Sequence, residues 1–382
     1  MDISDEIASL TALRRDIHAH PELAYNELRT AALVADELRA LDLEVTTGIG
    51  GTGVVGTLRR GASQRSLGFR ADMDALGFQE ETGLPYASRT PGVFHGCGHD
   101  GHTAILLGAA RRLARTGDFS GVIHFIFQPA EEGKGGAREM LKAGLFDRFP
   151  CDRVFALHNW PDLPAGSLQT RPGPIMAAAD RFDVLVTGKG GHAAQPHQTP
   201  DAILAAAELV GQLNTIVSRR VPPTEQAVLS VTAIEGGQTH NVIPAEVRII
   251  GTVRTFDVIV QDTIEASVRD MAAGVALSSG TRIEVAYNRY YPATINDPQC
   301  AALALEAAAA VCEAAQAPAP AFTSEDFAFM LQSCPGAYVW LGQRRAADSP
   351  ALHNPRYDFN DDVIGVGVAW FEELARRLLP AA

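Results

Sequence analysis

Residues 94–103, FHGCGHDGHT, gather histidine, cysteine and aspartate side chains in one glycine-broken stretch. Thiolate and imidazole groups are ligands for transition metals. Cys97 and His99 are two residues apart, so their side chains lie on the same face if the backbone there is extended. The stretch therefore predicts part of a metal site.

Other metal-capable side chains follow apolar runs that read as strands: Asp72 and Asp74 after SLGF, Glu131 and Glu132 after VIHFIFQPA, His158 after VFAL, and His353 after AYVWLG. Ligands of open parallel sheets bind beyond the carboxyl ends of the strands. Several separate segments thus deliver side chains to one place. Thiolate, imidazole and carboxylate together suit Zn²⁺, Mn²⁺ or Co²⁺ better than Ca²⁺ or Mg²⁺.

The adjacent carboxylates Glu131 and Glu132 cannot easily point the same way. We interpret one as a metal ligand and the other as the base that takes a proton from an attacking water. The alternative is that both glutamates are solvated surface residues. Their position between an apolar strand and GKGG argues against a solvated helix face. His95, His102 and His124 are more simply explained as structural or surface residues.

The elements that must position these residues alternate between strands and helices, which predicts an α/β fold with a mostly parallel sheet. Helical patterns cover 4–41 (broken at HPEL) and 103–115, and strand-like runs cover 54–58, 66–69, 122–127 and 154–157. From about residue 178 the order becomes strand 181–188, helix 201–218, strand 227–234, strand 246–256, helix 259–277 and strand 282–291. This βαββαβ order is typical of a ferredoxin-like α+β domain. Then follow a helix at 300–315, a loop at 314–321, a strand at 337–342 and a helix at 365–379.

Length and pattern together predict a discontinuous metal-binding domain at 1–178 and 293–382, interrupted by an inserted domain at 179–292. The net charge of −13 argues against a nucleic-acid partner, which needs a basic stripe. No apolar run reaches the ~18 residues of a membrane span, and the start reads as an amphipathic helix rather than a signal peptide. Five scattered cysteines without CxxC fit a reducing cytoplasm.

One motif is misleading. GIGGTG at 48–53 spells GxGxxG, but a dinucleotide site needs a helix after it, and VVGTLRRG reads as a strand. Ser324 in TSEDFA has no obvious base beside it, so we do not interpret it as a nucleophile.

Taken together, the motifs resemble those of the M20 metallopeptidases, in the branch of hippurate hydrolases, N-acyl-amino-acid amidohydrolases and auxin-conjugate hydrolases. The resemblance rests on RADMDAL, HGCGHDGHT, FQPAEEGKGGARE, ALHNWP, GKGGHAAQPH, NVIPAE, TSEDFA and LHNPRYDFND, and covers nearly the whole chain. It implies a zinc-peptidase-like catalytic domain and an inserted lid that also forms a homodimer. It also implies a small-molecule N-acyl amino acid substrate.

The resemblance also implies roles for single residues. Two divalent ions (Mn, Zn or Co) would be held by five ligands: Cys97, His99, Glu132, His158 and His353. Glu131 would be the general base, and Asp74 would orient the ligands. In the inserted domain, His192 would stabilise the oxyanion at a neighbouring active site, while Asn241 and Arg254 would hold the far end of the substrate.

Two alternatives stay open: a dipeptidase or carboxypeptidase of the same fold, which a cysteine ligand disfavours, and an inactive metal-binding or small-molecule-binding homologue. The acyl group, the native metal and the oligomeric state are not determined by the residues alone.

Overall fold

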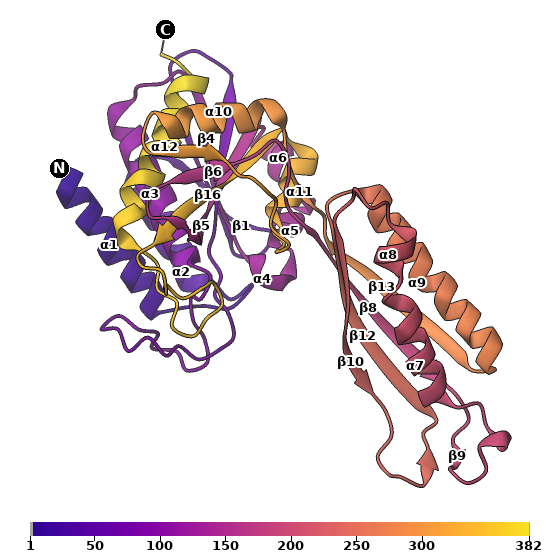
Figure 1. Ribbon diagram of the computed structural model, residues 1–382. Coiled ribbons are helices and arrows are strands. Elements are labelled where there is room, and N and C mark those ends of the chain that lie inside the picture. Colours follow the sequence, from indigo (N-terminus) through magenta and orange to yellow (C-terminus); the bar gives the residue numbers. More distant parts are fainter. Residues whose placement is uncertain (1–2, 382) are drawn as a thin grey trace. The chain divides into compact units, whose positions relative to one another are not determined.

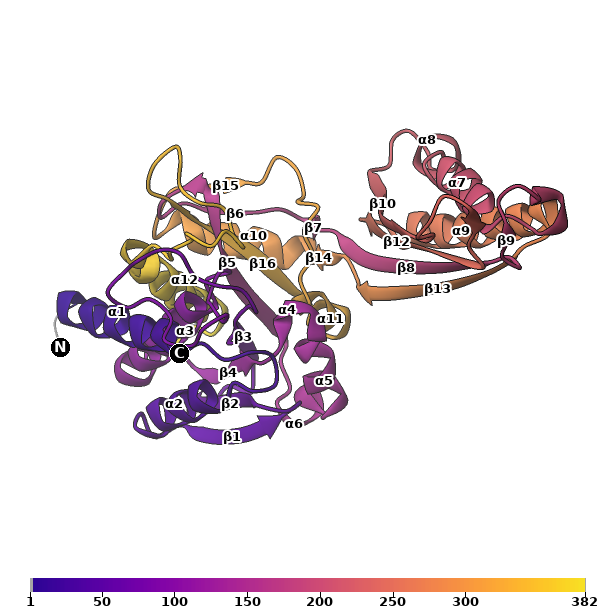
Figure 2. The same cartoon turned by 90° about the horizontal axis from the view of Figure 1, so that it is seen from below.

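The structure is a computed structural model that describes residues 3–381 (Figures 1 and 2). Contacts divide the chain into two compact units. The first contains the described residues up to 175, 295–319 and those from 326 on, and the second contains 176–294 and 320–325. The crossings at 175/176 and 294/295 lie within three residues of the predicted boundaries at 178/179 and 292/293.

The first unit is built on one eight-stranded sheet with the order β1-β2-β4-β3-β5-β16-β6-β15. The pairs β4–β3, β3–β5, β5–β16 and β6–β15 are parallel, and β1–β2, β2–β4 and β16–β6 are antiparallel. The strands are β1 (Glu44–Ile49), β2 (Gly53–Arg60), β3 (Ser66–Asp72), β4 (Gly121–Gln128), β5 (Arg153–Pro164), β6 (Leu168–Thr170), β15 (Ala314–Gln316) and β16 (Gly336–Arg344). The predicted mostly parallel sheet is confirmed, with antiparallel strands toward its edges.

Helices cover both faces of this sheet. They are α1 (Ile3–Ala19), α2 (Leu28–Arg39), α3 (His99–Thr116), α4 (Glu131–Lys134), α5 (Gly136–Lys142), α6 (Leu145–Arg148), α10 (Pro298–Ala309), α11 (Phe327–Ser333) and α12 (Ile364–Leu378). Successive side chains of a strand point to opposite faces. Phe69 of β3 packs on Phe371 of α12, with ring centroids 4.9 Å apart, whereas the Arg70 guanidinium lies 5.7 Å from the Phe327 ring of α11. The α12 face holds the large apolar core, and the α11 face carries the buried polar groups described below.

The second unit has a four-stranded antiparallel sheet with the order β10-β12-β8-β13, and helices lie on one of its faces (Figure 1). Its main elements are β8 (Ala178–Thr187), α7 (Ala202–Leu213), α8 (Ile216–Arg220), β10 (Ala227–Glu235), β12 (Glu246–Thr255), α9 (Val258–Ser279) and β13 (Arg282–Tyr291). The alternating burial of β12 matches a sheet with one covered face. The order of elements is the predicted βαββαβ. Short strands β7 (Gly173–Met176) and β14 (Thr294–Asn296) lie where the chain crosses between the units.

Three local predictions were wrong. The Ala-rich helix ends at Ala309 rather than 315, and Ala314–Gln316 is a strand rather than a loop because it pairs in parallel with Leu168–Thr170. Hydrogen bonds to a distant strand here override the helix propensity of alanine. The helix expected at 201–218 is divided into α7 and α8. Asn214, between them, turns its side chain back to the Val210 carbonyl at 2.8 Å, as asparagine often does at helix ends.

Across residues 3–381, none of the helices has the combination of length and apolar character that a bilayer span requires.

Candidate metal centre

The glycines of FHGCGHDGHT allow the chain to pass close to its neighbours. Gly98 has φ +87°, and a Cβ atom on it would lie 2.5 Å from Asn159 Oδ1 and 2.7 Å from the Tyr357 hydroxyl. Only glycine fits both this conformation and this space. The turn at Gly98 starts α3 at His99, so Cys97 and His99 lie at the N-terminal end of a helix.

All five expected ligands come together in the first unit. Cys97 Sγ is 3.5 Å from His158 Nε2, and Glu132 Oε1 is 3.4 Å from His353 Nε2 and 3.9 Å from His99 Nε2. Donor atoms of Cys97, His99 and Glu132 lie within 4.8 Å of one another. Side chains from the start of α3, from α4, from the middle of β5 and from the turn at His353 therefore converge on one point.

The His99 ring has one satisfied and one unsatisfied nitrogen. Its Nδ1–H donates to the Asp74 carbonyl oxygen at 2.9 Å. Nε2 is buried without a hydrogen-bond partner in the described part of the chain, and Asp72 Oδ2 lies 3.7 Å from it. Burial disfavours a charge on the ring, but Asp72, Asp74 and Glu132 outweigh it and raise the pKa of His99 to about 10. The carboxylates thus require a cation at this position, either a proton or a metal ion.

His158 presents a free lone pair to the same point. Its Nδ1–H donates to the Asn159 carbonyl at 2.8 Å, which leaves Nε2 unprotonated and facing Cys97. Burial and the neighbouring His102 hold the pKa of His158 well below its ordinary value, so the ring is neutral. A neutral imidazole whose other nitrogen is held by a carbonyl is the usual form of a histidine ligand.

The residues present fit a transition metal. Glu132 Oε1, like His99 Nε2, is buried without a hydrogen-bond partner among the described residues. Burial would raise the pKa of Glu132, but His353 and His99 hold it below its ordinary value. A thiol, three imidazoles and a carboxylate with unsatisfied lone pairs form a donor set for Zn²⁺, Mn²⁺ or Co²⁺. A transition metal at this point would be held by Cys97, His99, Glu132, His158 and His353.

His102 and Asp72 lie beside these ligands but already have partners. The Asn159 N–H donates to His102 Nε2 at 3.0 Å, and His102 Nδ1–H donates to Asp72 Oδ1 at 2.6 Å. Arg70 donates to Asp72 Oδ2 at 2.8 Å. Burial opposes ionisation, but His99, Arg70 and His102 hold the pKa of Asp72 well below its ordinary value. Both His102 nitrogens have hydrogen-bond partners here, although its ring also belongs, with Asp72, His99 and His158, to a group whose donor atoms lie within 4.8 Å of one another.

Asp74 holds the turn that carries the two glutamates. Its Oδ1 accepts the Glu131 N–H at 3.0 Å and its Oδ2 accepts the Glu132 N–H at 2.9 Å. The preceding Ala130 has φ +55°, a strained conformation for a residue with a side chain. Its N–H is held by Glu27 at 2.9 Å. This distorted turn separates the two carboxylates, so they can perform different tasks.

Glu131 is 7% exposed and does not belong to the Cys97–His99–Glu132 cluster. The Asp326 N–H donates to Glu131 Oε1 at 3.3 Å. The Asp326 carboxylate in turn accepts hydrogen bonds from Arg70 at 3.1 Å, Gln128 at 2.7 Å and the Ala137 N–H at 2.9 Å. Asp326 therefore fixes one side of the expected base.

Sequence reasoning missed Arg70 and Asp326. Arg70 is 1% exposed and bridges Asp72 and Asp326, two carboxylates 254 positions apart (326 minus 72). An arginine two residues before an aspartate in an otherwise apolar strand was the available signal, since a buried arginine needs a partner. The acidic residues of the motif TSEDFA were a second available signal.

The other histidines of the expected set lie away from the ligands. His124 exchanges a hydrogen bond with Thr57 at 2.9 Å, and burial with nearby Arg59 lowers its pKa to about 4. Neither ring nitrogen of His95 has a hydrogen-bond partner within the described chain, and burial lowers its pKa to about 3. Its ring lies 6.2 Å from that of His18. His95 belongs to no metal-capable group of the described residues.

The second unit separates its expected site residues. His192 is exposed and pairs with Val242 through the short strands β9 (Gly191–His192) and β11 (Val242–Ile243), which brings it next to Asn241. Arg254 lies at the other end of β12, eight residues past Glu246 (254 minus 246). At ~3.3 Å per residue this is roughly 26 Å. Within one chain, Arg254 and Asn241 therefore do not meet.

The geometry of each residue is informative. The Ala194 N–H donates to His192 Nδ1 at 3.1 Å. Nδ1 is therefore the unprotonated nitrogen of the neutral ring, and Nε2 carries the N–H that can donate a hydrogen bond. Arg254 is half-buried and donates to Thr252 and to the Val253 carbonyl at 3.0 Å. No carboxylate of the described residues forms an ion pair with it, and burial lowers its pKa. The Arg254 guanidinium therefore has no anionic partner among the described residues.

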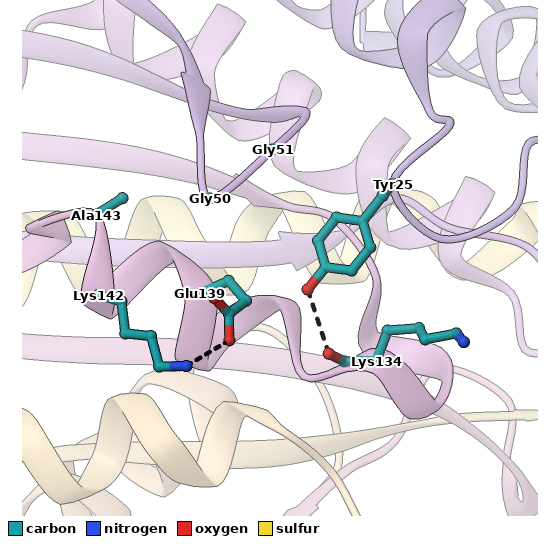
Figure 3. Close-up of a pocket in the computed structure, with 7 residues that line it drawn as sticks. All are labelled: Tyr25, Gly50, Gly51, Lys134, Glu139, Lys142 and Ala143. Atoms are coloured by element: carbon teal, nitrogen blue, oxygen red, sulfur yellow. Dashed lines mark hydrogen bonds and ion pairs between the residues drawn. The ribbon is translucent and has the colours of Figure 1, made fainter.

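An open surface cavity of about 760 Å³ lies beside Lys134, past the glutamate turn (Figure 3). It is lined by Tyr25, Gly50, Gly51, Lys134, Glu139, Lys142 and Ala143. Lys142 pairs with Glu139 at 2.8 Å, and the Tyr25 hydroxyl donates to the Lys134 carbonyl at 3.2 Å. None of the expected ligands lines it, so we do not assign the chemistry to this cavity.

Comparison with known proteins agrees with this geometry. Residues 68–377 match Peptidase family M20/M25/M40, and the chain belongs to this family. It is 39% identical to hippurate hydrolase of Campylobacter jejuni, over 99% of this chain and 98% of that protein. It is 36% identical to N-acetylcysteine deacetylase of Bacillus subtilis, over 96% of each. The crystal structure of YxeP of Bacillus subtilis, described as a dinuclear metal-binding peptidase of family M20, superposes with a TM-score of 0.86 at 34% identity, covering 98% of this chain and 99% of that one.

Proposed function

We propose that the protein hydrolyses the amide bond of N-acyl amino acids and releases a carboxylic acid and a free amino acid. The main support is the convergence of Cys97, His99, Glu132, His158 and His353, in which His99 Nε2 and Glu132 Oε1 are buried and have no hydrogen-bond partner among the described residues. The relatives named hippurate hydrolase and N-acetylcysteine deacetylase give independent support. We propose two divalent ions, Mn²⁺, Zn²⁺ or Co²⁺, as the cofactor.

When bound, such ions polarise the amide carbonyl and lower the pKa of coordinated water. Glu131 accepts the proton of the attacking water and donates it to the leaving amine. Asp326 N–H keeps the Glu131 carboxylate oriented, and Asp74 holds the backbone of both glutamates. Arg254 binds the free carboxylate of the amino acid, since its fork can donate two parallel hydrogen bonds. His192 Nε2–H stabilises the negative oxygen of the tetrahedral intermediate.

The second unit suggests that the active site is shared in a homodimer. A small N-acyl amino acid cannot span the roughly 26 Å of β12 that separate Arg254 from the end near His192. If both residues act on one substrate, they come from different chains. We therefore propose that His192 of the partner subunit serves each site, and that Asn241 of the partner subunit accompanies it. The five free cysteines support a reducing, cytoplasmic location.

The first test is a substrate panel. Metal-stripped protein receives Mn²⁺, Zn²⁺ or Co²⁺ one at a time and is assayed with hippurate, N-acetylmethionine, N-acetyldiaminopimelate, an indole-acetyl amino acid and simple dipeptides. We expect metal-dependent cleavage of acyl amino acids. Cleavage of dipeptides alone would favour the peptidase alternative. Metal binding without any cleavage would favour an inactive homologue.

The second test separates the base from the ligands. Glu131→Gln keeps the shape of the side chain and should lower kcat by roughly 10²–10⁴-fold with metal content unchanged. Glu139→Gln, on a half-exposed glutamate of the next helix, is the matched control and should keep full activity. Full activity of Glu131→Gln would refute its role as base.

The third test addresses the shared site. Glu131→Gln and His192→Ala should each be inactive. After random mixing of chains, half of the dimers are mixed, and each mixed dimer has one intact site, so about a quarter of the wild-type activity should return. No recovery, with mixed dimers demonstrably formed, would mean that His192 acts within its own chain, and an active His192→Ala variant would mean that it does not act at all.

A further inference from the structure

Two tryptophans stand beside the metal ligand His158 with no role in the steps above. Trp160 follows His158 by two residues on β5, so both side chains point to the same face of the sheet, about 7 Å apart along the strand. Trp340 on β16 is the register partner of His158 in the parallel pair β5–β16. Side chains in register on parallel strands share a face, so all three lie together.

The face they share is not the one that holds the large apolar core. Phe155, on the other face of β5, packs on Trp370 of α12 at 6.5 Å. The His158 ring instead lies 6.2 Å from the ring of Tyr338, which lies 6.0 Å from Phe327 of α11. The indole pair (Trp160 and Trp340) therefore continues the polar face of the sheet, beyond His158 toward the end of the strand.

The indole pair forms a flat wall. The two rings are stacked, with centroids 4.4 Å apart and an interplanar angle of 20°. Trp340 is 5% exposed, while Trp160 is half-buried and keeps part of its surface open to solvent. Trp340 Nε1–H is buried and has no hydrogen-bond acceptor in the described part of the chain. A buried donor left without a partner is unfavourable, and an acceptor on a bound molecule would satisfy it.

We propose that the indole pair packs against the acyl group of the substrate and makes this enzyme prefer flat aromatic acyl groups over acetyl. The proposal rests on the proposed function. The amino acid end of the substrate carries a carboxylate, and two indole rings provide no charge to pair with it. The acyl end carries no charge, and an aromatic acyl group gains both burial and stacking against an indole.

The experiment compares three substrates with the metal-loaded enzyme: N-benzoylglycine, N-acetylglycine and N-acetylphenylalanine. Wild type should prefer N-benzoylglycine to N-acetylglycine. Trp160→Leu should lower kcat/KM for N-benzoylglycine roughly tenfold, mainly through KM, because stacking binds the ground state and the transition state alike. Its kcat/KM for N-acetylglycine should change less than about twofold. Trp160→Phe should keep most of the preference.

Phe146→Leu, on a half-buried aromatic of α6, is the matched control and should leave all three substrates unchanged. Equal losses on N-benzoylglycine and N-acetylglycine would overturn the proposal, because they indicate general damage to the fold. A loss confined to N-acetylphenylalanine would also overturn it, because the wall would then contact the amino acid side chain.

Two further outcomes separate this proposal from the function on which it rests. If wild type hydrolyses none of these three substrates and none of the other acyl amino acids of the panel above, the proposed function fails. If wild type hydrolyses N-acetylglycine and Trp160→Leu keeps the preference for N-benzoylglycine, the proposed function stands and only the role of the indole pair is refuted. A test on wild type alone uses the free acids as inhibitors. Benzoate should inhibit competitively at lower concentration than acetate, and equal inhibition constants would contradict contact between the acyl group and the indole pair.

Discussion

His18 should make the stability of the first unit depend on pH in the alkaline range. Its ring is fully buried between two carboxylates, with Nδ1 2.8 Å from Asp100 Oδ2 and Nε2 3.4 Å from Glu80 Oε1. Burial opposes a charge on the ring, but Asp100 and Glu80 outweigh it and raise the pKa of His18 to about 9, from 6.5 in the unfolded chain. The folded protein therefore holds this proton more tightly than the unfolded chain does.

The magnitude follows from the two pKa values. At about 1.4 kcal/mol per pKa unit, the difference between 6.5 and about 9 corresponds to about 3 kcal/mol. Because the folded pKa is the higher one, this contribution is fully present below pH 6.5 and is lost as the pH rises through 9. His18→Gln removes the charge at every pH. The difference in unfolding free energy between wild type and His18→Gln should therefore shrink by about 3 kcal/mol between pH 6 and pH 10.

The assay is urea unfolding followed by circular dichroism at pH 6, 8 and 10, with a chelator present so that metal binding does not contribute. His20→Gln is the matched control, because His20 lies directly after the end of α1 and its side chain is 32% exposed. Its effect on the unfolding free energy should be small. A constant difference between wild type and His18→Gln across this range would refute a charged His18 in the folded protein.

Three further predictions concern the metal centre and the inserted domain. Asp74→Asn should lower metal affinity roughly 10–100-fold, because its side chain has only one oxygen to accept the two N–H groups of Glu131 and Glu132. Calorimetry with Mn²⁺ measures this affinity, and an unchanged value would contradict the role of Asp74. Chelation should abolish hydrolysis and lower the thermal midpoint, and adding one metal back should restore both; a midpoint unaffected by metal would speak against the centre. Arg254→Lys should raise KM for acyl amino acids with kcat nearly unchanged, because the second of two parallel hydrogen bonds is lost; an unchanged KM would exclude Arg254 from carboxylate binding.

The gathering of the expected ligands at one place could be predicted from the sequence because these residues follow strands. Asp72 and His158 each come at or after the end of an apolar run, and parallel strands end at the same edge of the sheet. The separation of Glu131 and Glu132 followed from their adjacency alone, and the distorted turn after Ala130 agrees with it. Local spacing and strand order thus contained most of the information about where the donor atoms gather.

Contacts between distant segments could not be predicted in this way. The hydrogen bonds that occupy His102 come from Asp72 and from the backbone at Asn159, and the chain around His102 contains no sign of either. Similarly, Asn241 and Arg254 are only thirteen residues apart (254 minus 241), yet a long strand places them at opposite ends of the second unit. Which partner fills a buried polar group, and which end of a strand a residue occupies, depend on packing that a single sequence does not display.

Arg70 links the two halves of the site. One guanidinium donates to Asp72, which orients His102 beside the metal ligands, and to Asp326, whose N–H holds Glu131. The buried Arg70 guanidinium forms ion pairs with both buried carboxylates and offsets their negative charge. Removing one partner of such a network typically costs about 3–5 kcal/mol. The surroundings of the expected ligands and of the expected base are therefore linked by one shared charge. A change that displaces Arg70 should disturb metal binding and proton transfer together, whereas Glu131→Gln should disturb proton transfer alone.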